Sequence, residues 1–157
     1  LAQDEVDRAV DLLHGSSAVY VVGSRLSYTF AYYLGWSLTK IRTRVQIMRG
    51  SDSTCIDFLT IAPADALVVV FATTRYPNEL IRLGKLAKRL ALTLLVITDG
   101  ALCPLIPFAD LSIVAPSRHM GVQITPGHTV LTLILKGASC SGGKPARSTT
   151  SETVSRA

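Results

Sequence analysis

Five short apolar runs recur along the chain, and each is followed by a segment with helical periodicity or by a turn. The runs are rich in Val, Ile and Leu and show almost no alternation with polar residues. That pattern is typical of parallel strands that are buried on both faces. Strands are therefore predicted at Ala18–Val22, Arg44–Met48, Ala66–Phe71, Leu92–Ile97 and Leu111–Val114.

The segments between these runs predict helices. In the first of them, Val6, Val10 and Leu13 fall on one face at helical spacing. Strict alternation of strand and helix predicts an α/β fold, with a doubly wound five-stranded parallel sheet flanked by helices and joined by right-handed crossovers. The helices are predicted at Gln3–His14, Leu26–Lys40, Ser51–Ile61, Asn78–Leu90, Leu102–Phe108 (a short one) and His128–Lys136.

Composition predicts one domain followed by a tail. The chain has 157 residues, of which 48% are hydrophobic and 17% charged, so it can bury a sizeable core. After Gly137 the sequence turns to Ser, Thr and Gly, and we expect a domain over 1–137 and a flexible tail over 138–157. No segment has the length of a membrane span. The chain starts at Leu1 rather than at a Met, and we expect it to be a piece of a longer protein.

The cysteines and the net charge restrict the class of protein only loosely. Cys55, Cys103 and Cys140 are too few and too scattered for a disulfide framework or a zinc site, so a cytoplasmic location is expected. The formal net charge of +5 fits attraction to nucleic acid, and it fits a basic face for an anionic small ligand equally well.

Two of the predicted strands run into loops that combine hydroxyl groups with one arginine. The first hydroxyl loop is Gly23–Ser27 and the second is Ala72–Arg75, and each leads directly into a predicted helix. Helix N-termini stabilise anions, and Ser, Thr and Arg add donors, so these loops predict a phosphate site. The loop after the second strand adds Ser51 and Ser53. The candidate ligand-binding residues are Gly23, Ser24, Arg25, Ser27, Ser51, Ser53, Thr73, Thr74 and Arg75.

Each candidate also has a purely structural explanation, and the sequence does not decide between that explanation and ligand binding. Ser27 would serve as a helix cap or first-turn serine, and Ser51 and Ser53 as N-cap residues. The two threonines would bond to their own backbone. Arginines in the loops would pair with nearby acids, which are Asp52 and Glu79.

These residues resemble the sugar isomerase (SIS) domain, a phosphosugar-binding module, over about residues 6–136. The stretch VYVVGSRLSYTFAYYL is similar to the family's first strand, its Gly-x-x-x-Ser loop and the next helix. The stretch ALVVVFATTRYPNEL is similar to the third strand with its phosphate loop. The most specific match is Thr98-Asp99, Pro104-Leu105 and Ala109-Asp110, which stand in the family's order. The resemblance implies a flavodoxin-like strand order and a homodimer or tetramer.

Within that family, the stretch Arg75–Glu79 resembles the RpiR/MurR transcriptional regulators, which join a helix-turn-helix domain to a C-terminal SIS domain. The resemblance implies a phosphosugar-sensing effector domain whose ligand is a phosphorylated sugar or a sugar acid. DNA would be bound only through an N-terminal domain that this chain lacks, and residues 1–14 would form the connecting helix. No catalytic residue, metal, cofactor or membrane partner is expected.

Two other functions stay open at this point. An aldose–ketose isomerase would need a glutamate with a histidine, and the available residues are Glu79, His14, His119 and His128. The family's phosphate loop often reads Ser-x-Ser-Gly-x-Thr, whereas this chain has exchanged hydroxyls for charge, which suits a sensor better than a catalyst. The third hypothesis is a dimerisation module that has lost its ligand.

Two faces of the predicted helices carry side chains that the phosphate site does not use. Tyr32, Tyr33 and Trp36 form an aromatic band, for which core packing or a helix–helix interface is more common than ligand stacking. A basic face on the fourth helix is expected to be solvated, because no groove-entering element accompanies it.

Overall fold

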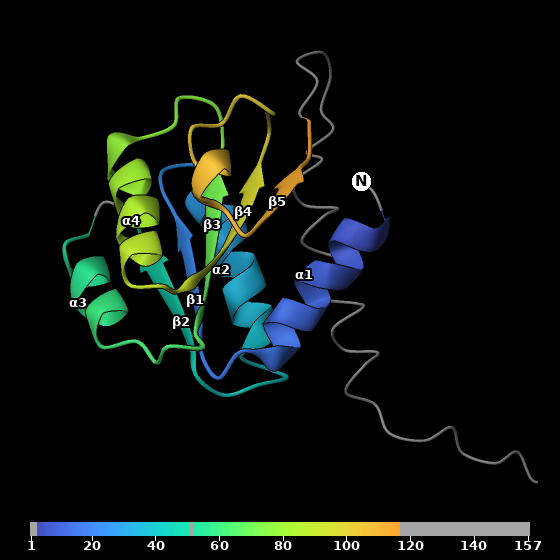
Figure 1. Ribbon diagram of the computed structural model, residues 1–157, viewed down its shortest axis with the longest axis vertical. Helices are drawn as coiled ribbons and strands as arrows, with labels where there is room; N and C mark the ends of the chain where they lie inside the picture. The colour runs from blue at the N-terminus through green and yellow to red at the C-terminus, as the bar shows by residue number, and fades with distance from the viewer. Residues whose placement is uncertain (1–2, 51, 117–157) are drawn as a thin grey trace, which may run out of the picture.

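The computed structural model describes residues 3–50 and 52–116, which form a five-stranded, all-parallel sheet with helices on both faces (Figure 1). The strand order is β2-β1-β3-β4-β5, which confirms the predicted doubly wound sheet and its flavodoxin-like order. The strands are β1 (Val19–Gly23), β2 (Val45–Arg49), β3 (Leu67–Ala72), β4 (Thr93–Thr98) and β5 (Leu111–Val114). The helices are α1 (Gln3–Gly15), α2 (Ser27–Leu38), α3 (Thr54–Thr60), α4 (Asn78–Arg89) and the 3-10 turn η1 (Ile106–Phe108).

The sheet separates two hydrophobic cores, which explains why its strands read as continuous apolar runs. In β3, Leu67, Val69 and Phe71 pack with α1 and α2. The alternate residues Val68 and Val70 pack on the opposite face with α3, α4 and the segment around η1. Successive strand side chains point to opposite faces, so a strand covered on both sides needs an apolar residue at nearly every position.

Two predicted helices are shorter in the structure. The helix expected from Ser51 begins at Thr54, because the carboxylate of Asp52 accepts the amide proton of Thr54 at 3.1 Å and ends the loop there. The helix expected over Leu102–Phe108 is reduced to the single turn η1. The predicted helix His128–Lys136 and the tail 138–157 lie outside the described residues.

The carboxyl ends of four strands meet at one edge of the sheet, where the strand order reverses around β1. Gly23 lies beside Arg49 of β2 and beside Phe71 of β3. Ala72 at the end of β3 pairs with Thr98 at the end of β4. In open parallel sheets this edge holds the ligand, so the register brings the predicted site loops to the expected place.

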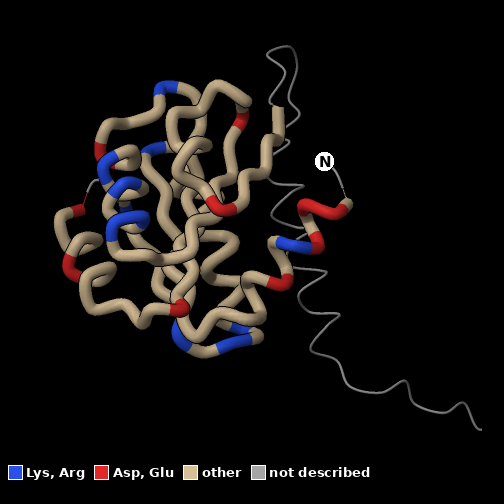
Figure 2. The backbone as a smooth tube through the Cα atoms, viewed as in Figure 1, with Lys and Arg blue, Asp and Glu red and all other residues tan. Residues whose placement is uncertain are grey.

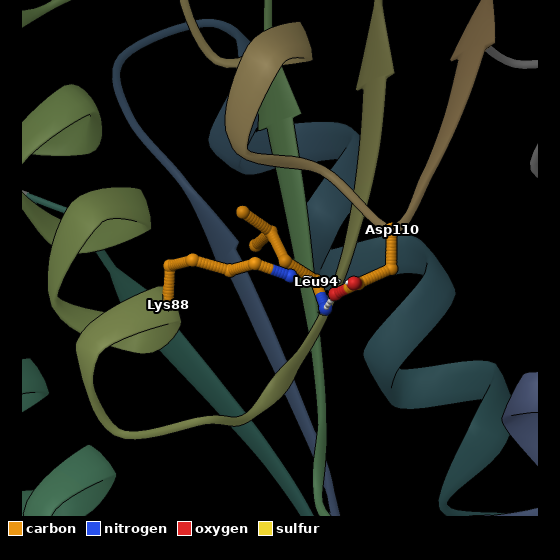
Figure 3. Close-up of polar contacts among 3 residues, drawn as sticks. All are labelled: Lys88, Leu94 and Asp110. Carbon is orange, nitrogen blue, oxygen red and sulfur yellow. Dashed lines mark hydrogen bonds and ion pairs between the residues drawn. The ribbon is translucent and has the colours of Figure 1, made fainter.

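Two contacts fasten elements away from that edge. Arg42, which follows α2, donates to the carbonyl oxygens of Leu13 and Ser16, the latter at 2.7 Å. It therefore joins the end of α2 to the end of α1. At the opposite side of the sheet, Asp110 accepts hydrogen bonds from the ammonium of Lys88 and the amide of Leu94 (Figure 3).

Within residues 3–50 and 52–116, no helix has both the length and the apolar character that crossing a membrane requires.

Candidate functional site

The first hydroxyl loop is compact because α2 lies almost on top of the end of β1. A Cβ atom on Gly23 would meet the carbonyl oxygen of Ser27 at 2.6 Å and the Cα atom of Tyr28 at 2.7 Å. Only glycine fits that close approach. Gly23 thus determines how near the start of α2 comes to the sheet.

Ser27 closes this loop with its side chain. Its buried hydroxyl donates to the carbonyl oxygen of Ser24 at 2.7 Å and accepts the amide proton of Ser24 at 3.1 Å. Ser27 therefore has the structural role that the sequence left open: it is a first-turn serine whose hydroxyl forms hydrogen bonds with its own loop. A contact between Ser27 and a ligand stays a prediction, as it does for Ser24, which is itself largely buried.

Both loop arginines adopt the same uncommon backbone conformation. Arg25 has φ 54° and Arg75 has φ 72°, which is the left-handed region that residues other than glycine seldom occupy. Both side chains are exposed, and within the described part of the chain neither forms an ion pair. The pairing with Asp52 or Glu79 that the sequence left open is absent from the structure, so both guanidinium groups are available to an anion.

A third arginine stands at the same edge and was missed by the sequence reasoning. Arg49 ends β2, lies beside Gly23 in the register, and places its guanidinium 4.9 Å from the ring centre of Tyr28. The signal in the sequence is its position as the last residue of a strand. The prediction covered only the loops that follow the strands, so it did not include Arg49.

The second hydroxyl loop is organised around a carboxylate from the neighbouring strand. The amide of Thr74 donates to Oδ2 of Asp99 at 2.7 Å, and the hydroxyl of Thr74 donates to the same oxygen. The hydroxyl of Tyr76 donates to Oδ1 at 3.2 Å. Threonines in this loop were expected either to contact a ligand or to bond their own backbone. For Thr74 the structure shows a third arrangement, in which a side chain from after β4 takes its donors.

The protonation states fit that arrangement. Burial opposes ionisation of Asp99, but the hydrogen bonds from Thr74 and Tyr76 outweigh it and hold the pKa of Asp99 below its usual value. Burial, together with the negative charge of Asp99, raises the pKa of the Tyr76 hydroxyl. At neutral pH the cluster is therefore an ionised carboxylate that accepts from neutral donors.

A groove of about 510 Å³ lies beside this edge, between α3 and α4. Ser53, one of the predicted site residues, lines the groove together with Glu79 from the first turn of α4. Arg82 and Arg89 add positive charge to the lining of the groove, which also includes the apolar residues Ile56, Leu83 and Leu86. Ser51 lies outside the described residues. The basic face of α4 was predicted to be solvated, but two of its arginines line this groove. Arg82 and Arg89 are seven positions apart, which places them on the same side of a helix, and this spacing was the signal in the sequence.

The charges divide between the two sides of the sheet. Figure 2 shows Asp and Glu gathered along α1 and Lys and Arg along α4. Positive charge also lies at the carboxyl edge, which Arg25, Arg49 and Arg75 provide. The same edge and groove also carry the acids Asp52, Glu79 and Asp99, so charges of both signs meet there.

Within residues 3–50 and 52–116, the groups that commonly serve in acid–base, thiolate or metal chemistry lie apart from one another. His14 is the one histidine of the described residues, and it lies in the last turn of α1, at the edge opposite the two hydroxyl loops. His119 and His128 lie outside the described residues. Burial and the nearby Asp52 raise the pKa of the Cys55 thiol to about 11, so it is not a thiolate at neutral pH. Among the described residues, no group of three His, Cys, Asp or Glu side chains could hold a metal ion.

The comparisons with known proteins agree with this fold. The family model for the SIS domain matches residues 12–135. A search of curated protein sequences gives no match. The sugar isomerase domain of an RpiR transcription factor from Sphaerobacter thermophilus superposes with a TM-score of 0.82 at 22% identity, covering 88% of this chain and 79% of that one.

Two further solved structures share the fold at lower identity. The Vibrio vulnificus NanR protein, solved in complex with ManNAc-6P, has a TM-score of 0.74 at 16% identity over 88% of this chain and 55% of that one. A protein of Methanococcus jannaschii, for which the function of a 3-hexulose-6-phosphate isomerase is inferred, has a TM-score of 0.62 at 14% identity over 88% of this chain and 76% of that one. The shared architecture thus occurs both in a transcription factor and in a protein for which an isomerase function is inferred.

Proposed function

The chain belongs to the SIS domain family, and from that premise we propose that it is the phosphosugar-sensing effector domain of an RpiR-type transcriptional regulator. Its ligand is a phosphorylated sugar or a related sugar acid, bound at the carboxyl edge of the sheet. DNA is bound only through a helix-turn-helix domain outside this chain, and the protein acts in the cytoplasm.

One observation carries this proposal above the others. The ends of β1 and β3, which are neighbours in the sheet, both lead into helices through loops that hold hydroxyl groups and an exposed arginine, and neither arginine forms an ion pair with another described residue. Arg25 and Arg75 thus come shortly before the N-termini of α2 and α4. Helix N-termini and arginine together favour an anionic group, and phosphate accepts bidentate hydrogen bonds from a guanidinium.

The sensing role is preferred to catalysis because of the groups around the edge. Isomerisation of a sugar phosphate requires an acid–base pair that can move protons between adjacent carbons. Glu79 is at the start of α4, but none of the described residues at this edge is a histidine. The neighbours in the fold include a protein with an inferred isomerase function, so absence of turnover is part of the proposal and has to be measured.

A homodimer or tetramer is part of the same proposal. A regulator of this kind needs two quaternary states with different affinities for the ligand. The outer face of α2 is suited to such an interface, because Tyr32, Tyr33 and Trp36 are each about half exposed, at 50%, 47% and 47%. Aromatic side chains are enriched at protein interfaces.

The decisive experiment is a thermal-shift screen of the chain against a panel of sugar phosphates, the matching free sugars and sugar acids. We expect at least one sugar phosphate or sugar acid to raise the melting temperature, and the Arg25→Ala and Arg75→Ala variants to lose that shift. Arg8→Ala is the matched control, because it removes an exposed positive charge from α1, away from the site loops and from the aromatic face of α2.

The same panel separates the alternatives. Conversion of an aldose phosphate to a ketose phosphate, followed by NMR, would make the chain an isomerase and contradict the sensing role. A flat thermal response across the whole panel would leave a dimerisation module that has lost its ligand.

A further inference from the structure

The feature that the proposed function leaves unexplained is the carboxylate of Asp99 inside the second hydroxyl loop. Both donors of Thr74, its amide and its hydroxyl, point at Oδ2 of Asp99, and the hydroxyl of Tyr76 points at Oδ1. These are the kinds of donor that a phosphate group would otherwise engage at the end of β3. The loop therefore already holds an anion, and that anion is part of the chain.

The sheet itself positions this carboxylate. Ala72 and Thr98 are paired in the register of β3 and β4, so the residues that follow them, Thr73 and Asp99, leave the sheet side by side. Thr74 and Asp99 are consequently brought together by strand pairing. Gly100 follows directly, and a Cβ atom there would meet the hydroxyl of Tyr76 at 3.2 Å, so the turn after Asp99 is closely fitted to the same cluster.

Charge makes the arrangement selective. A phosphate at the donors of Thr74 would lie within hydrogen-bond reach of an ionised carboxylate, and like charges at that separation repel each other. Each N–H and O–H group has one proton, so a phosphate could not share these donors without displacing Asp99. The exposed Arg75 offers charge nearby, but it does not free the donors of Thr74.

A neutral hydroxyl group meets the opposite situation. An ionised carboxylate has about four acceptor positions, and three of them are used by the two groups of Thr74 and the hydroxyl of Tyr76. The remaining position can accept the proton of a sugar hydroxyl. Hydrogen bonds from neutral donors to a charged acceptor are stronger than those between neutral groups.

We propose that Asp99 is the residue that orients the ligand, because its carboxylate keeps phosphate out of the second hydroxyl loop and accepts a neutral sugar hydroxyl there instead. The inference rests on the proposed function only in taking the ligand to be a sugar derivative with an anionic end. That anionic end then lies away from the donors of Thr74, toward the exposed guanidinium groups of Arg25, Arg49 and Arg75.

The test uses inorganic phosphate as the probe and the backbone amide of Thr74 as the reporter in heteronuclear NMR. In the wild-type chain, phosphate should leave the Thr74 resonance in place. In Asp99→Asn the negative charge is gone, and the neutral amide oxygen is a weaker acceptor that phosphate can displace from the donors of Thr74. Phosphate should then shift the Thr74 resonance and bind about tenfold more tightly or better, as expected when a neighbouring like charge is removed.

Two further variants make the result specific. Asp65→Asn changes the net charge by the same amount at the opposite edge of the sheet, where Asp65 accepts a hydrogen bond from Ser17, and it should leave phosphate binding unchanged. Asp99→Ser is a second neutral variant, which replaces Asp99→Asn if the asparagine chain does not fold.

The outcomes separate this inference from the proposed function. If folded neutral variants show no phosphate-dependent shift at Thr74, Asp99 does not exclude phosphate, whatever the wild-type chain does with sugar phosphates. A wild-type shift at Thr74 would overturn the inference in the same way. If the neutral variants respond but no sugar derivative binds the wild-type chain, the exclusion of phosphate by Asp99 stands, and both the sensing function and the acceptance of a sugar hydroxyl fail.

Discussion

Two hydrogen bonds join Asp110, the residue directly before β5, to Leu94 of β4. The amide of Asp110 donates to the carbonyl oxygen of Leu94 at 2.9 Å, and the carboxylate of Asp110 accepts the amide proton of Leu94 at 2.9 Å. The other carboxylate oxygen accepts from Lys88 at 2.6 Å. Asp110 thus fixes the start of β5 against β4 and α4, at the edge opposite the candidate site. The aspartate of the SIS-like Ala109-Asp110 pair therefore has a structural role, which is to hold β5 in place.

Replacing Asp110 should cost more stability than replacing its ionic partner. Asp110→Ala leaves the amide of Leu94 without its acceptor, which should lower the free energy of unfolding by about 1–3 kcal/mol. Lys88→Ala removes an ion pair whose side chains are 48% and 39% exposed, so the loss should be under about 1 kcal/mol. Urea denaturation measures both. Equal losses would mean that the ion pair, and not the hydrogen bond to Leu94, holds β5.

The close approach at Gly23 predicts a position-specific effect of one methyl group. Gly23→Ala would force a Cβ atom to within 2.6 Å of a backbone oxygen of α2, which cannot move away as a side chain can. We expect a loss of about 1–3 kcal/mol of stability, as for overpacked cores. Gly15→Ala is the matched control, because nothing lies within 4 Å of its added Cβ and alanine favours the helix. A tolerated Gly23→Ala substitution would contradict the described packing of α2 on β1.

The contact between Arg42 and the end of α1 predicts local loosening. Arg42→Ala removes the donors to the carbonyl oxygens of Leu13 and Ser16, which end α1 and the turn after it. Amide hydrogen exchange should become faster along α1 while β3 keeps its protection, because opening of a terminal helix is a local event. Arg8→Ala, on the exposed face of α1, serves as the control. Unchanged exchange in Arg42→Ala would show that α1 is held by its apolar face alone.

The stability of the chain should fall in acid partly because of Asp99. The pKa of Asp99 is lower in the folded chain than in the unfolded chain, where an aspartate has a pKa of about 3.9. Its contribution is therefore fully present above that value and is lost as the pH falls through the lower, folded pKa. Urea unfolding at a series of pH values should show the wild-type chain and Asp99→Asn converging below about pH 4. A constant difference down to the acid limit would mean that Asp99 is not ionised in the folded chain.

Much of the fold could be predicted from the order of residues because it rests on local patterns. The run from Ala66 to Phe71 is apolar at every position, which requires a strand covered on both faces, and the structure places it in the middle of the sheet. The helix predicted from Ser51 began later because Asp52, not a serine, supplies the acceptor for the first helical amide. Which of the three polar residues 51–53 accepts that amide proton depends on the geometry of the loop, and hydrophobic periodicity carries no information about it.

The sequence by itself determined the class of fold, the five strands and the edge where hydroxyl groups and arginines gather. Those properties follow from apolar periodicity and from the residues that come directly after each strand. Only the tertiary structure decided what these residues contact. Thr74 and Asp99 are 25 positions apart, and no pattern within either loop shows that they share a hydrogen bond. The pairing of β3 with β4 brings them together, and it turns a loop that reads as a phosphate cradle into one that already holds an anion.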